Sequence, residues 1–257
     1  MNAKTLTISI VGSGNVAHQL AQAFYKRGLC IYQIVSRDVA NAADLAASCK
    51  AKAVDFKEFD FAVDVVLLCV KDDSIKEIAS RFKNYEGVLV HSSGSVRLDV
   101  LSYSEKSAVF YPFVSMVKGI EMDFEEVDIY VEGSDKVSLN VVKSLALLLS
   151  SQVSVMNSSQ RAALHLSAVF AQNFTNHLMV IASDLLQQQG LDYALLRPLL
   201  SSYFQKLNQY SPAELQTGPA VRKDGFVIES HLTMLENDVQ WKLFYEMFTK
   251  SIQQKNK

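Results

Sequence analysis

The chain has 257 residues, of which 49% are hydrophobic and 20% charged, and its formal net charge is −2. A chain of this length and composition buries a substantial core, which excludes an intrinsically disordered protein. The small net charge gives no electrostatic reason to expect nucleic acid or an anionic membrane as a partner.

No segment predicts a membrane protein or a secreted one. The longest apolar stretch, Ala162–Ala182, is interrupted by histidines and amides that a bilayer would have to bury. Met1–Lys4 leads directly into a strand-like segment, without the long apolar region and cleavage site of a signal peptide. Cys30, Cys49 and Cys69 form no CxxC pair, so they indicate small apolar residues in a reducing cytoplasm. We therefore expect a cytoplasmic protein without disulfides or a metal site.

In the first half of the chain, short apolar runs alternate with helical patterns. Continuous apolar runs are typical of strands that are buried on both faces of a parallel sheet. They predict strands over Leu6–Val11, Leu29–Val35, Asp64–Val70, Val88–His91, Ala108–Tyr111, Asp128–Glu132 and Gln152–Met156. Helical spacing predicts helices over Asn15–Arg27, Val39–Lys50, Asp72–Phe82 and Asp135–Ser150. This alternation predicts an α/β fold, a doubly wound parallel sheet of the Rossmann type, over residues 1–156.

Beyond residue 156 the pattern is purely helical, which predicts an all-α domain over residues 157–257. A helix is expected from a cap at Asn157 or Ser158 to about Gln189, a length of about 48 Å. Further helices are expected over Tyr193–Tyr210 and Ile228–Gln254, with a loop rich in proline and glycine between them. So much apolar helix surface exceeds what a small domain covers by itself, and it predicts a homodimer through the helical domain.

The run Gly12-Ser13-Gly14-Asn15-Val16-Ala17 follows the first predicted strand and opens the first helix, with the spacing G-x-G-x-x-A. In this fingerprint the first glycine permits a tight turn and the second lets the backbone approach a pyrophosphate, while the small third residue allows close helix–strand packing. The helix N-terminus offers unpaired N–H groups and a positive dipole end to the anion. We therefore predict a dinucleotide site that includes Gly12, Ser13, Gly14, Asn15 and Val16.

The end of the second strand, Val35-Ser36-Arg37, indicates which dinucleotide binds. NAD-binding domains usually place an acidic residue there for the ribose hydroxyls, and none is present. Arg37 offers a guanidinium to the 2′-phosphate of NADP, and Ser36 offers a hydroxyl. The prediction is therefore NADP, and the same missing acid disfavours S-adenosylmethionine. Two alternatives stay open, in which Arg37 pairs with Asp38 or is a solvated surface residue.

Two further strand ends complete the predicted cofactor site. Because ligands of Rossmann domains lie at the carboxyl ends of the strands, Val70 is expected to border the cofactor. Asp72 or Asp73 is expected to cap the helix that follows. His91 and Ser93 end the next strand, where a nicotinamide would lie, and His91 is either near that ring or a core residue bonded to the backbone.

These motifs resemble a known family, the Rossmann-like NADP oxidoreductases with a C-terminal helical domain of unknown function. Besides the cofactor motifs, three stretches carry the resemblance: Phe110-Tyr111-Pro112-Phe113, the Arg161…His165…Asn173 helix, and Thr217-Gly218-Pro219. The family is similar to deazaflavin-dependent NADP reductases and pyrroline-carboxylate reductases, and the resemblance covers nearly the whole chain. It implies a two-domain fold, NADP as cofactor and a dimer built through the helical half. It implies no particular substrate, because the family has no settled one.

The polar residues of the long predicted helix are candidates for catalysis. On an α-helix, four of them would lie within about 40° of one line along its surface: Arg161, His165, Gln172 and Asn176. Asn173 lies about 80° from that line. If such a stripe is buried, its members need hydrogen-bond partners. By the resemblance, His165 is the candidate acid–base and Asn173 the group that orients the substrate, and a purely structural His165 is the alternative.

The loop Gln216–Asp224 is a candidate for contact with the substrate. Thr217, the backbone around Gly218 and the guanidinium of Arg222 suit a carboxylate or a phosphate. A turn tied by an ion pair between Arg222 and Asp224 is equally compatible with the sequence.

Together these observations predict an NADP-dependent oxidoreductase that transfers hydride between NADP(H) and a small polar substrate with a C=O or C=N bond. The alternative is a catalytically inactive NADP-binding sensor or scaffold, because a Rossmann fold by itself does not establish turnover. A phosphotransferase is disfavoured because the sequence contains no G-x-x-x-x-G-K-[ST] loop.

Overall fold

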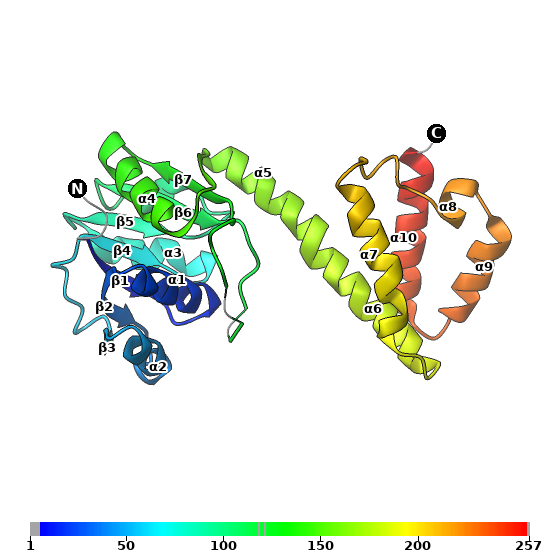
Figure 1. Cartoon of the computed structure of the whole chain (residues 1–257), viewed down its shortest axis with the longest axis horizontal. Coiled ribbons are helices and arrows are strands. Elements are labelled where there is room, and N and C mark those ends of the chain that lie inside the picture. Colours follow the sequence, from blue (N-terminus) through cyan, green and yellow to red (C-terminus); the bar gives the residue numbers. More distant parts are fainter. Residues whose placement is uncertain (1–5, 118, 121, 256–257) are drawn as a thin grey trace. The chain divides into compact units, whose positions relative to one another are not determined.

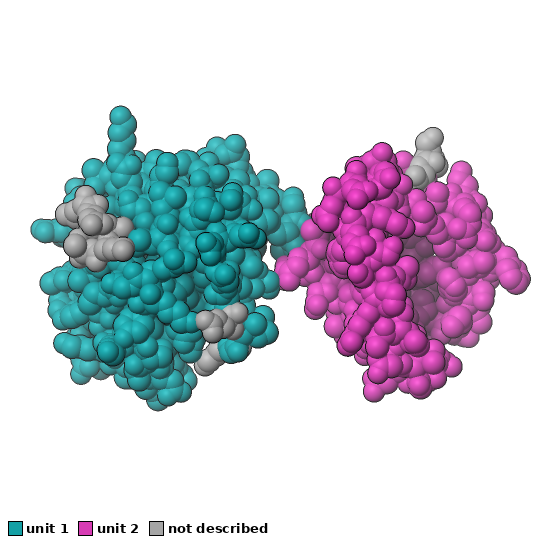
Figure 2. Space-filling view, viewed as in Figure 1, with its two compact units in different colours: residues 1–169 teal, residues 170–257 magenta. Residues whose placement is uncertain are grey.

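The computed structural model describes residues 6–117, 119–120 and 122–255. Met1–Lys4, on which the expectation about a signal peptide rests, lie outside the described residues. The chain divides into two compact units, residues 1–169 and 170–257. Figure 1 shows the elements of each unit, and Figure 2 colours the two units separately. The domain boundary expected from the sequence follows residue 156, whereas the first compact unit also includes the start of the long helix.

The first unit is built on an eight-stranded sheet with the order β3-β2-β1-β4-β5-β6-β7-β8. Its strands are β1 (Thr7–Val11), β2 (Cys30–Val35), β3 (Lys52–Val54), β4 (Val65–Leu68), β5 (Val88–His91), β6 (Ser107–Pro112), β7 (Ile129–Gly133) and β8 (Val153–Val155). All pairings from β3 to β6 are parallel, whereas β7 runs antiparallel to β6 and β8 parallel to β7. Sheet growth changes direction between β1 and β4, which is where Rossmann domains bind their ligands.

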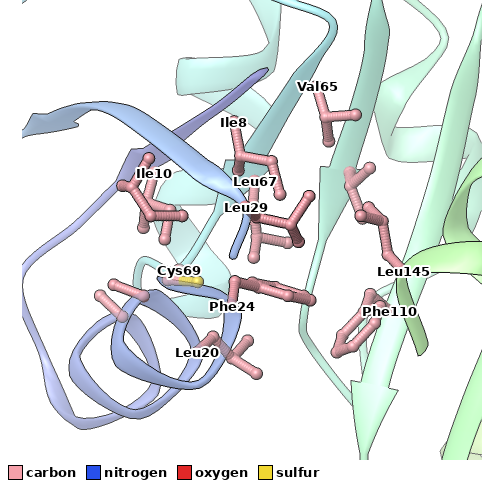
Figure 3. Close-up of a cluster of buried hydrophobic side chains, with 14 of the residues drawn as sticks. Ile8, Ile10, Leu20, Phe24, Leu29, Val65, Leu67, Cys69, Phe110 and Leu145 are labelled. Atoms are coloured by element: carbon pink, nitrogen blue, oxygen red, sulfur yellow. The ribbon is translucent and has the colours of Figure 1, made fainter. Parts of the chain in front are cut away.

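Helices cover both faces of this sheet, so neighbouring strand residues are apolar on both sides. One face carries α1 (Asn15–Lys26), α2 (Ala40–Ser48) and α4 (Lys136–Leu149). The other carries α3 (Asp72–Ala79) and the short 3₁₀ segments η2 (Ser80–Phe82) and η3 (Leu98–Leu101). Figure 3 shows the first of these layers, in which side chains of β1 and β4 meet those of α1 and α4: Ile8, Ile10, Val65, Leu67, Leu20, Phe24 and Leu145. The sheet is thereby held as a rigid base for the residues at its edge.

The strands and helices predicted for the first half are confirmed, with ends that differ by a few residues. β3 was not predicted from the sequence. It has three residues, of which Lys52 is exposed, and a run that short carries no periodicity. The capping role expected of Asp72 or Asp73 is wrong, because Lys71 occupies the cap position of α3 and no side chain caps it. Both aspartates instead lie in the first turn of that helix.

The long helix begins as predicted. Asn157 caps α5 (Ser158–Ala168) in a capping box with Gln160, in which each side chain binds the other residue's backbone N–H. Helical structure continues through a π-helical segment, η4 (Val169–Phe174), into α6 (Thr175–Gln188). The hydroxyl of Thr175 donates to the Phe170 carbonyl, five residues back, over 3.3 Å.

The π-helical segment corrects the expected polar stripe. Because a π-helix turns less per residue than an α-helix, a projection that assumes α-helix throughout fails beyond Val169. Of the residues expected on the stripe, Arg161 alone is buried, at 1% exposure, and His165 is half-buried. Gln172, Asn173 and Asn176 are exposed.

The second unit is helical, as predicted. After α6 it contains η5 (Tyr193–Leu196), α7 (Arg197–Leu207), α8 (Pro219–Arg222), α9 (Gly225–Met234) and α10 (Val239–Lys255). The single helix expected over Ile228–Gln254 is wrong, because a turn in which Asp238 N–H binds the Leu235 carbonyl separates α9 from α10. The expected loop between the helices contains the short helix α8. Within residues 6–117, 119–120 and 122–255, no helix is both long and apolar enough to cross a bilayer.

Candidate functional site

A cleft of about 340 Å³ opens where β1, β2 and β4 end. Its lining combines the glycine turn, the end of β2 and the end of β4 with one face of α3: Gly12, Ser13, Gly14, Ser36, Arg37, Cys69, Val70, Lys71, Ser74, Glu77 and Ile78, together with Phe56 and Arg81. Six of the residues predicted to bind the cofactor therefore surround one cleft at the carboxyl edge of the sheet: Gly12, Ser13, Gly14, Ser36, Arg37 and Val70.

The two glycines of the turn serve different purposes. Gly12 has φ +122°, and a Cβ there would lie 2.1 Å from the Cys69 carbonyl oxygen, so only glycine fits between β1 and β4. Gly14 caps α1 with φ −80°, and of the described atoms none lies within 4 Å of where its Cβ would stand. The free space beside Gly14 and the N–H groups of α1 form a cradle that fits a pyrophosphate.

The side chains of Asn15 and Val16 are engaged by the protein itself, so only their backbone groups are left for a ligand. The Asn15 amide donates to the Met116 carbonyl over 3.2 Å, and Val16 packs against the core. One turn further along α1, the Gln19 amide donates to the carbonyls of Val117 and Ile120 over 2.9 and 2.6 Å. The first turns of α1 thus hold the segment after β6 beside the glycine turn.

Arg37 is available for a ligand. It is exposed and forms no ion pair with any residue that the structure describes. The expected competition from Asp38 does not occur, because that carboxylate accepts from the Ala40 N–H and the Asn41 amide, over 3.1 and 3.2 Å. A second guanidinium, that of Arg81, lies 4.9 Å from the centre of the Phe56 ring and 3.5 Å from the Glu77 carboxylate. Together with Lys71 these groups make the cleft attractive to an anion.

We expect NADPH to bind at least about tenfold more tightly than NADH, because one charge-assisted contact to the 2′-phosphate contributes about 1.5–3 kcal/mol. Arg37→Ala should weaken NADPH binding and leave NADH binding almost unchanged. Isothermal calorimetry with both cofactors measures this difference, and Arg97→Ala, an exposed arginine outside the cleft, is the matched control. Equal affinities in the wild type, or an Arg37→Ala variant that keeps the preference, would contradict the assignment.

His91 is a core residue, with 0% of its surface exposed. Its Nδ1 accepts the Ser93 N–H over 3.2 Å, and the Ser93 hydroxyl accepts the N–H groups of Ser95 and Val96 over 3.2 and 3.0 Å. The structure thus gives His91 the second of its two expected roles, that of a core residue bonded to the backbone, and its nearness to a nicotinamide stays a prediction. Ser93, with 8% exposure, shapes the same loop from inside. The loop is also fastened to α3, where the Ser95 hydroxyl donates to the Asp72 carboxylate.

The buried imidazole makes stability depend on pH. Burial, aided by the charge of Arg161, lowers the pKa of His91 from 6.5 to about 3. Below pH 6.5 the His91 imidazole therefore binds a proton in the unfolded chain but not in the folded chain. Stability is lost as pH falls from 6.5 towards 3. The expected slope is about 1.4 kcal/mol per pH unit. Urea denaturation gives the free energy of unfolding of the wild type and of His91→Leu across this pH range. The difference between the two proteins should change with that slope. A difference that stays constant with pH would contradict the prediction.

His165 lies against two residues from other parts of the first unit. Its Nδ1 is 3.0 Å from the hydroxyl of Tyr111, which is near the end of β6, and the two rings are inclined at 73°. Both rings rest on Gly94 in the loop after β5, where a Cβ would lie 2.7 Å from His165 Nδ1 and 2.7 Å from Tyr111 Cζ. β5 and β6 are parallel, so this pair lies at the same carboxyl edge as the dinucleotide cleft, on the next strands of the sheet.

An ion pair between Arg161 and Glu132 holds the start of α5 against the sheet. Arg161, one turn before His165, pairs with Glu132 at the end of β7 and donates to the Val96 carbonyl over 2.6 Å. Ser158 donates to the same carboxylate through its backbone and its hydroxyl, at 3.0 and 2.8 Å. Because buried charges need partners, Arg161 and Glu132 fix where α5 starts, and thereby where the His165 ring is held.

The remaining predicted site residues belong to the second unit. Thr217 lines an apolar hollow of about 270 Å³ between α6, α8 and α10, with Trp241 and Phe244 among the other lining side chains. Gly218 caps α8 with φ +107°. Arg222 lies 3.9 Å from Asp224, so the structure shows the ion-paired turn that the sequence left open as an alternative. Asn173 lies in η4 and is exposed.

The sequence alone did not identify Tyr111 as a site residue, nor the ion pair of Glu132 with Arg161. Tyr111 stands in an apolar strand, and no local spacing connects it with a histidine 54 residues away. The only signal was its place in the run that carries the family resemblance. Cys69 also lines the cleft, and burial raises the pKa of its thiol to about 12. The thiol is therefore uncharged near neutral pH and is no nucleophile.

Comparison with known proteins places these features in a family. Residues 7–93 match the family described as NADP oxidoreductase coenzyme F420-dependent, and residues 127–252 match a domain of unknown function, DUF2520. The crystal structure of BF3122 from Bacteroides fragilis, described as a "putative NADP oxidoreductase", is 33% identical, covers 98% of this chain and 99% of its own, and superposes with a TM-score of 0.92. No protein of curated function matches the chain.

More distant structures share the fold. Protein TM1727 from Thermotoga maritima is 26% identical, with coverage of 97% and 98% and a TM-score of 0.69. A reductive aminase from Aspergillus terreus, solved with NADPH, is 14% identical, covers 96% of this chain and 88% of its own, and has a TM-score of 0.63. The chain therefore belongs to the family of NADP oxidoreductases in which a Rossmann domain of the coenzyme F420-dependent type is followed by a DUF2520 domain, and NADP is its cofactor.

Proposed function

We propose that the protein transfers hydride between NADP(H) and the C=O or C=N bond of a small polar substrate. The observation that carries this proposal is the order of features along one sheet edge. The dinucleotide cleft lies at β1, β2 and β4, and the Tyr111–His165 pair lies at β5 and β6. A dinucleotide held in the cleft would lie along the same sheet edge as the pair.

The residues of the cleft fit the cofactor. The cradle beside Gly14 receives the pyrophosphate, and Ser36 with Arg37 receives the 2′-phosphate. When bound, NADPH supplies the hydride. His165 then donates a ring proton to the substrate oxygen or nitrogen, which the arriving hydride leaves negative, and accepts a proton there in the reverse reaction.

Small aldehydes, ketones and cyclic imines are the substrates with which to test this proposal. We expect the wild type to oxidise NADPH with at least one member of such a panel, measured by the loss of absorbance of the reduced nicotinamide. Because the aldehydes and ketones carry a C=O bond and the cyclic imines a C=N bond, the members that are reduced show which bond the protein acts on. A protein that binds NADPH tightly and oxidises it with no member of the panel would support the alternative, an NADP-binding sensor or scaffold.

Asn173 is proposed to orient the substrate. An amide both donates and accepts hydrogen bonds, which suits a polarised C=O or C=N group. With a substrate from the panel, Asn173→Ala should raise KM or lower kcat while the affinity for NADPH stays that of the wild type.

Thr217, Gly218 and Arg222 are proposed to bind a substrate carboxylate or phosphate. Thr217→Val should therefore affect acidic substrates more than neutral ones.

We further propose that the helical unit forms a homodimer. Among its described residues Ile181, Ala220 and Leu235 are the buried hydrophobic ones, whereas Phe226 is 86% and Val239 77% exposed. Further large apolar side chains are exposed along α7 and α10, among them Leu199, Phe204, Leu243 and Met247. Apolar surface on this scale marks an interface, and a second copy with two-fold symmetry covers it with the same residues.

Sedimentation velocity at micromolar concentration should therefore give the mass of a dimer. Phe226→Asp combined with Leu199→Asp should shift the protein to monomer, because charges at an apolar interface remain unpaired. Val137→Asp, which changes a 60% exposed valine of the first unit, is the matched control and should stay dimeric. A monomeric wild type would refute the proposal.

A further inference from the structure

Gly94 is the point at which three elements of the first unit meet around one pair of rings. Tyr111 comes from β6, His165 from α5, and Gly94 from the loop that follows β5. The phenol and the imidazole are 3.0 Å apart at Tyr111 Oη and His165 Nδ1, with ring centres separated by 6.0 Å. The Phe113 ring also packs against the phenol, with ring centres 6.2 Å apart. The site has space for this arrangement because position 94 carries no side chain.

We propose that Tyr111 is a positioning residue that holds the His165 ring and reserves its Nε2 for proton transfer to the substrate. This inference rests on the proposed function. Nδ1 is engaged by the phenol, and this is the one hydrogen bond that the His165 ring forms within the described part of the chain, so Nε2 is left for a ligand. A histidine whose one nitrogen is occupied by a fixed neighbour presents the other in a single direction.

The proton balance of the step is as follows. In the imidazolium form Nδ1–H donates to the Tyr111 oxygen, and Nε2–H faces the substrate. As the substrate is reduced by hydride from NADPH, its oxygen or nitrogen takes the Nε2 proton, and the ring becomes neutral. Solvent then returns a proton to Nε2, so Tyr111 keeps its own proton throughout. Burial raises the pKa of Tyr111 above its usual value of 10, which is consistent with a phenol that stays protonated.

The charged and titratable groups around the pair come from α5 itself, from α3 and from β7. Arg161, on the same helix one turn earlier, forms an ion pair with Glu132 in β7. Asp72 in α3 and Tyr130 in β7 also act on the Tyr111 hydroxyl through their charge. Arg161 lowers the pKa of Tyr111 and Asp72 raises it, so these two charges act on the phenol in opposite directions.

The pairing is tested first without any reaction. Protein labelled with ¹³C at tyrosine Cζ should show a Tyr111 signal that moves as His165 titrates, and His165→Ala should abolish that movement. The chain contains a matched control pair, because the Tyr245 hydroxyl lies 2.8 Å from His231 Nδ1. His231→Ala should remove the pH response of Tyr245 and leave that of Tyr111 in place. A Tyr111 signal that ignores the titration of His165 would overturn the inference.

The functional part is tested with Tyr111→Phe, which keeps the ring and its packing but removes the hydroxyl. With a substrate from the panel above, kcat should fall about tenfold while KM and the affinity for NADPH remain near those of the wild type. The dependence of kcat on pH should shift at the same time, because the contact removed is one to the titrating ring. An unchanged kcat in a variant that has lost the coupled titration would overturn the inference.

A second variant guards against an ambiguous result. Gly94→Ala places a methyl group where the two rings lie, so it should separate them and reproduce the loss of coupling and the fall in kcat. A Gly94→Ala protein that keeps full kcat with the rings uncoupled would overturn the inference as well. Failure of the proposed function has a different signature, since the wild type would then show the coupled titration but oxidise NADPH with no compound.

Discussion

Gly14→Val should abolish detectable NADPH binding and leave the protein folded. The valine side chain would enter the free space beside the turn, which is the space that the pyrophosphate needs. Loss of two charge-assisted hydrogen bonds from the helix N-terminus corresponds to a rise in Kd of at least about a hundredfold. The backbone at this position has φ −80°, which valine adopts without strain, so the melting temperature should fall by only a few degrees.

Gly12→Ala is the matched contrast within the same turn. Its Cβ would lie 2.1 Å from the Cys69 carbonyl oxygen at φ +122°, so β1 and β4 would have to separate. We expect a loss of several kcal/mol of folding free energy, seen as a large fall in the melting temperature. Calorimetric titration and thermal unfolding of both variants distinguish the two roles. If Gly14→Val still binds NADPH like the wild type, the cleft at this turn is not the cofactor site.

His165→Ala should lower kcat by about 10²–10⁴-fold with a substrate that the wild type reduces. The affinity for NADPH should change little, because His165 does not line the dinucleotide cleft. His165→Gln keeps a hydrogen-bond donor but delivers no proton near neutral pH, so it should be almost as slow. Stopped-flow measurement of NADPH oxidation in single turnovers isolates the chemical step from product release.

A structural role for His165 makes the opposite prediction. The alanine variant would then lose thermal stability through the missing contact with Tyr111 and keep its rate per folded molecule. His231→Ala serves as the control, because it removes a histidine with a comparable tyrosine contact from the second unit. Comparing kcat and melting temperature in the two variants therefore decides between catalysis and packing.

Much of the first unit was predictable because its determinants are local. Each strand from β1 to β5, apart from β3, is a mostly apolar run, and each intervening helix repeats its apolar residues at helical spacing. The dinucleotide turn was predictable for the same reason, since its glycines are two residues apart between a strand and a helix. The turn at Leu235–Asp238 was missed because the helical spacing on both sides continues without proline or glycine.

The sequence by itself determined the Rossmann class, the glycine turn and NADP as the cofactor, because each depends on residues that are neighbours in the chain. The tertiary structure alone decided the rest of the site. In the fold His91 is buried, and Asp38 accepts hydrogen bonds from the start of α2 instead of pairing with Arg37. Tyr111 and Gly94 lie against His165. A π-helical segment also lies where the sequence predicts uninterrupted α-helix. The physical reason is that these outcomes depend on which elements pack side by side, and contacts between distant segments leave no period in the sequence.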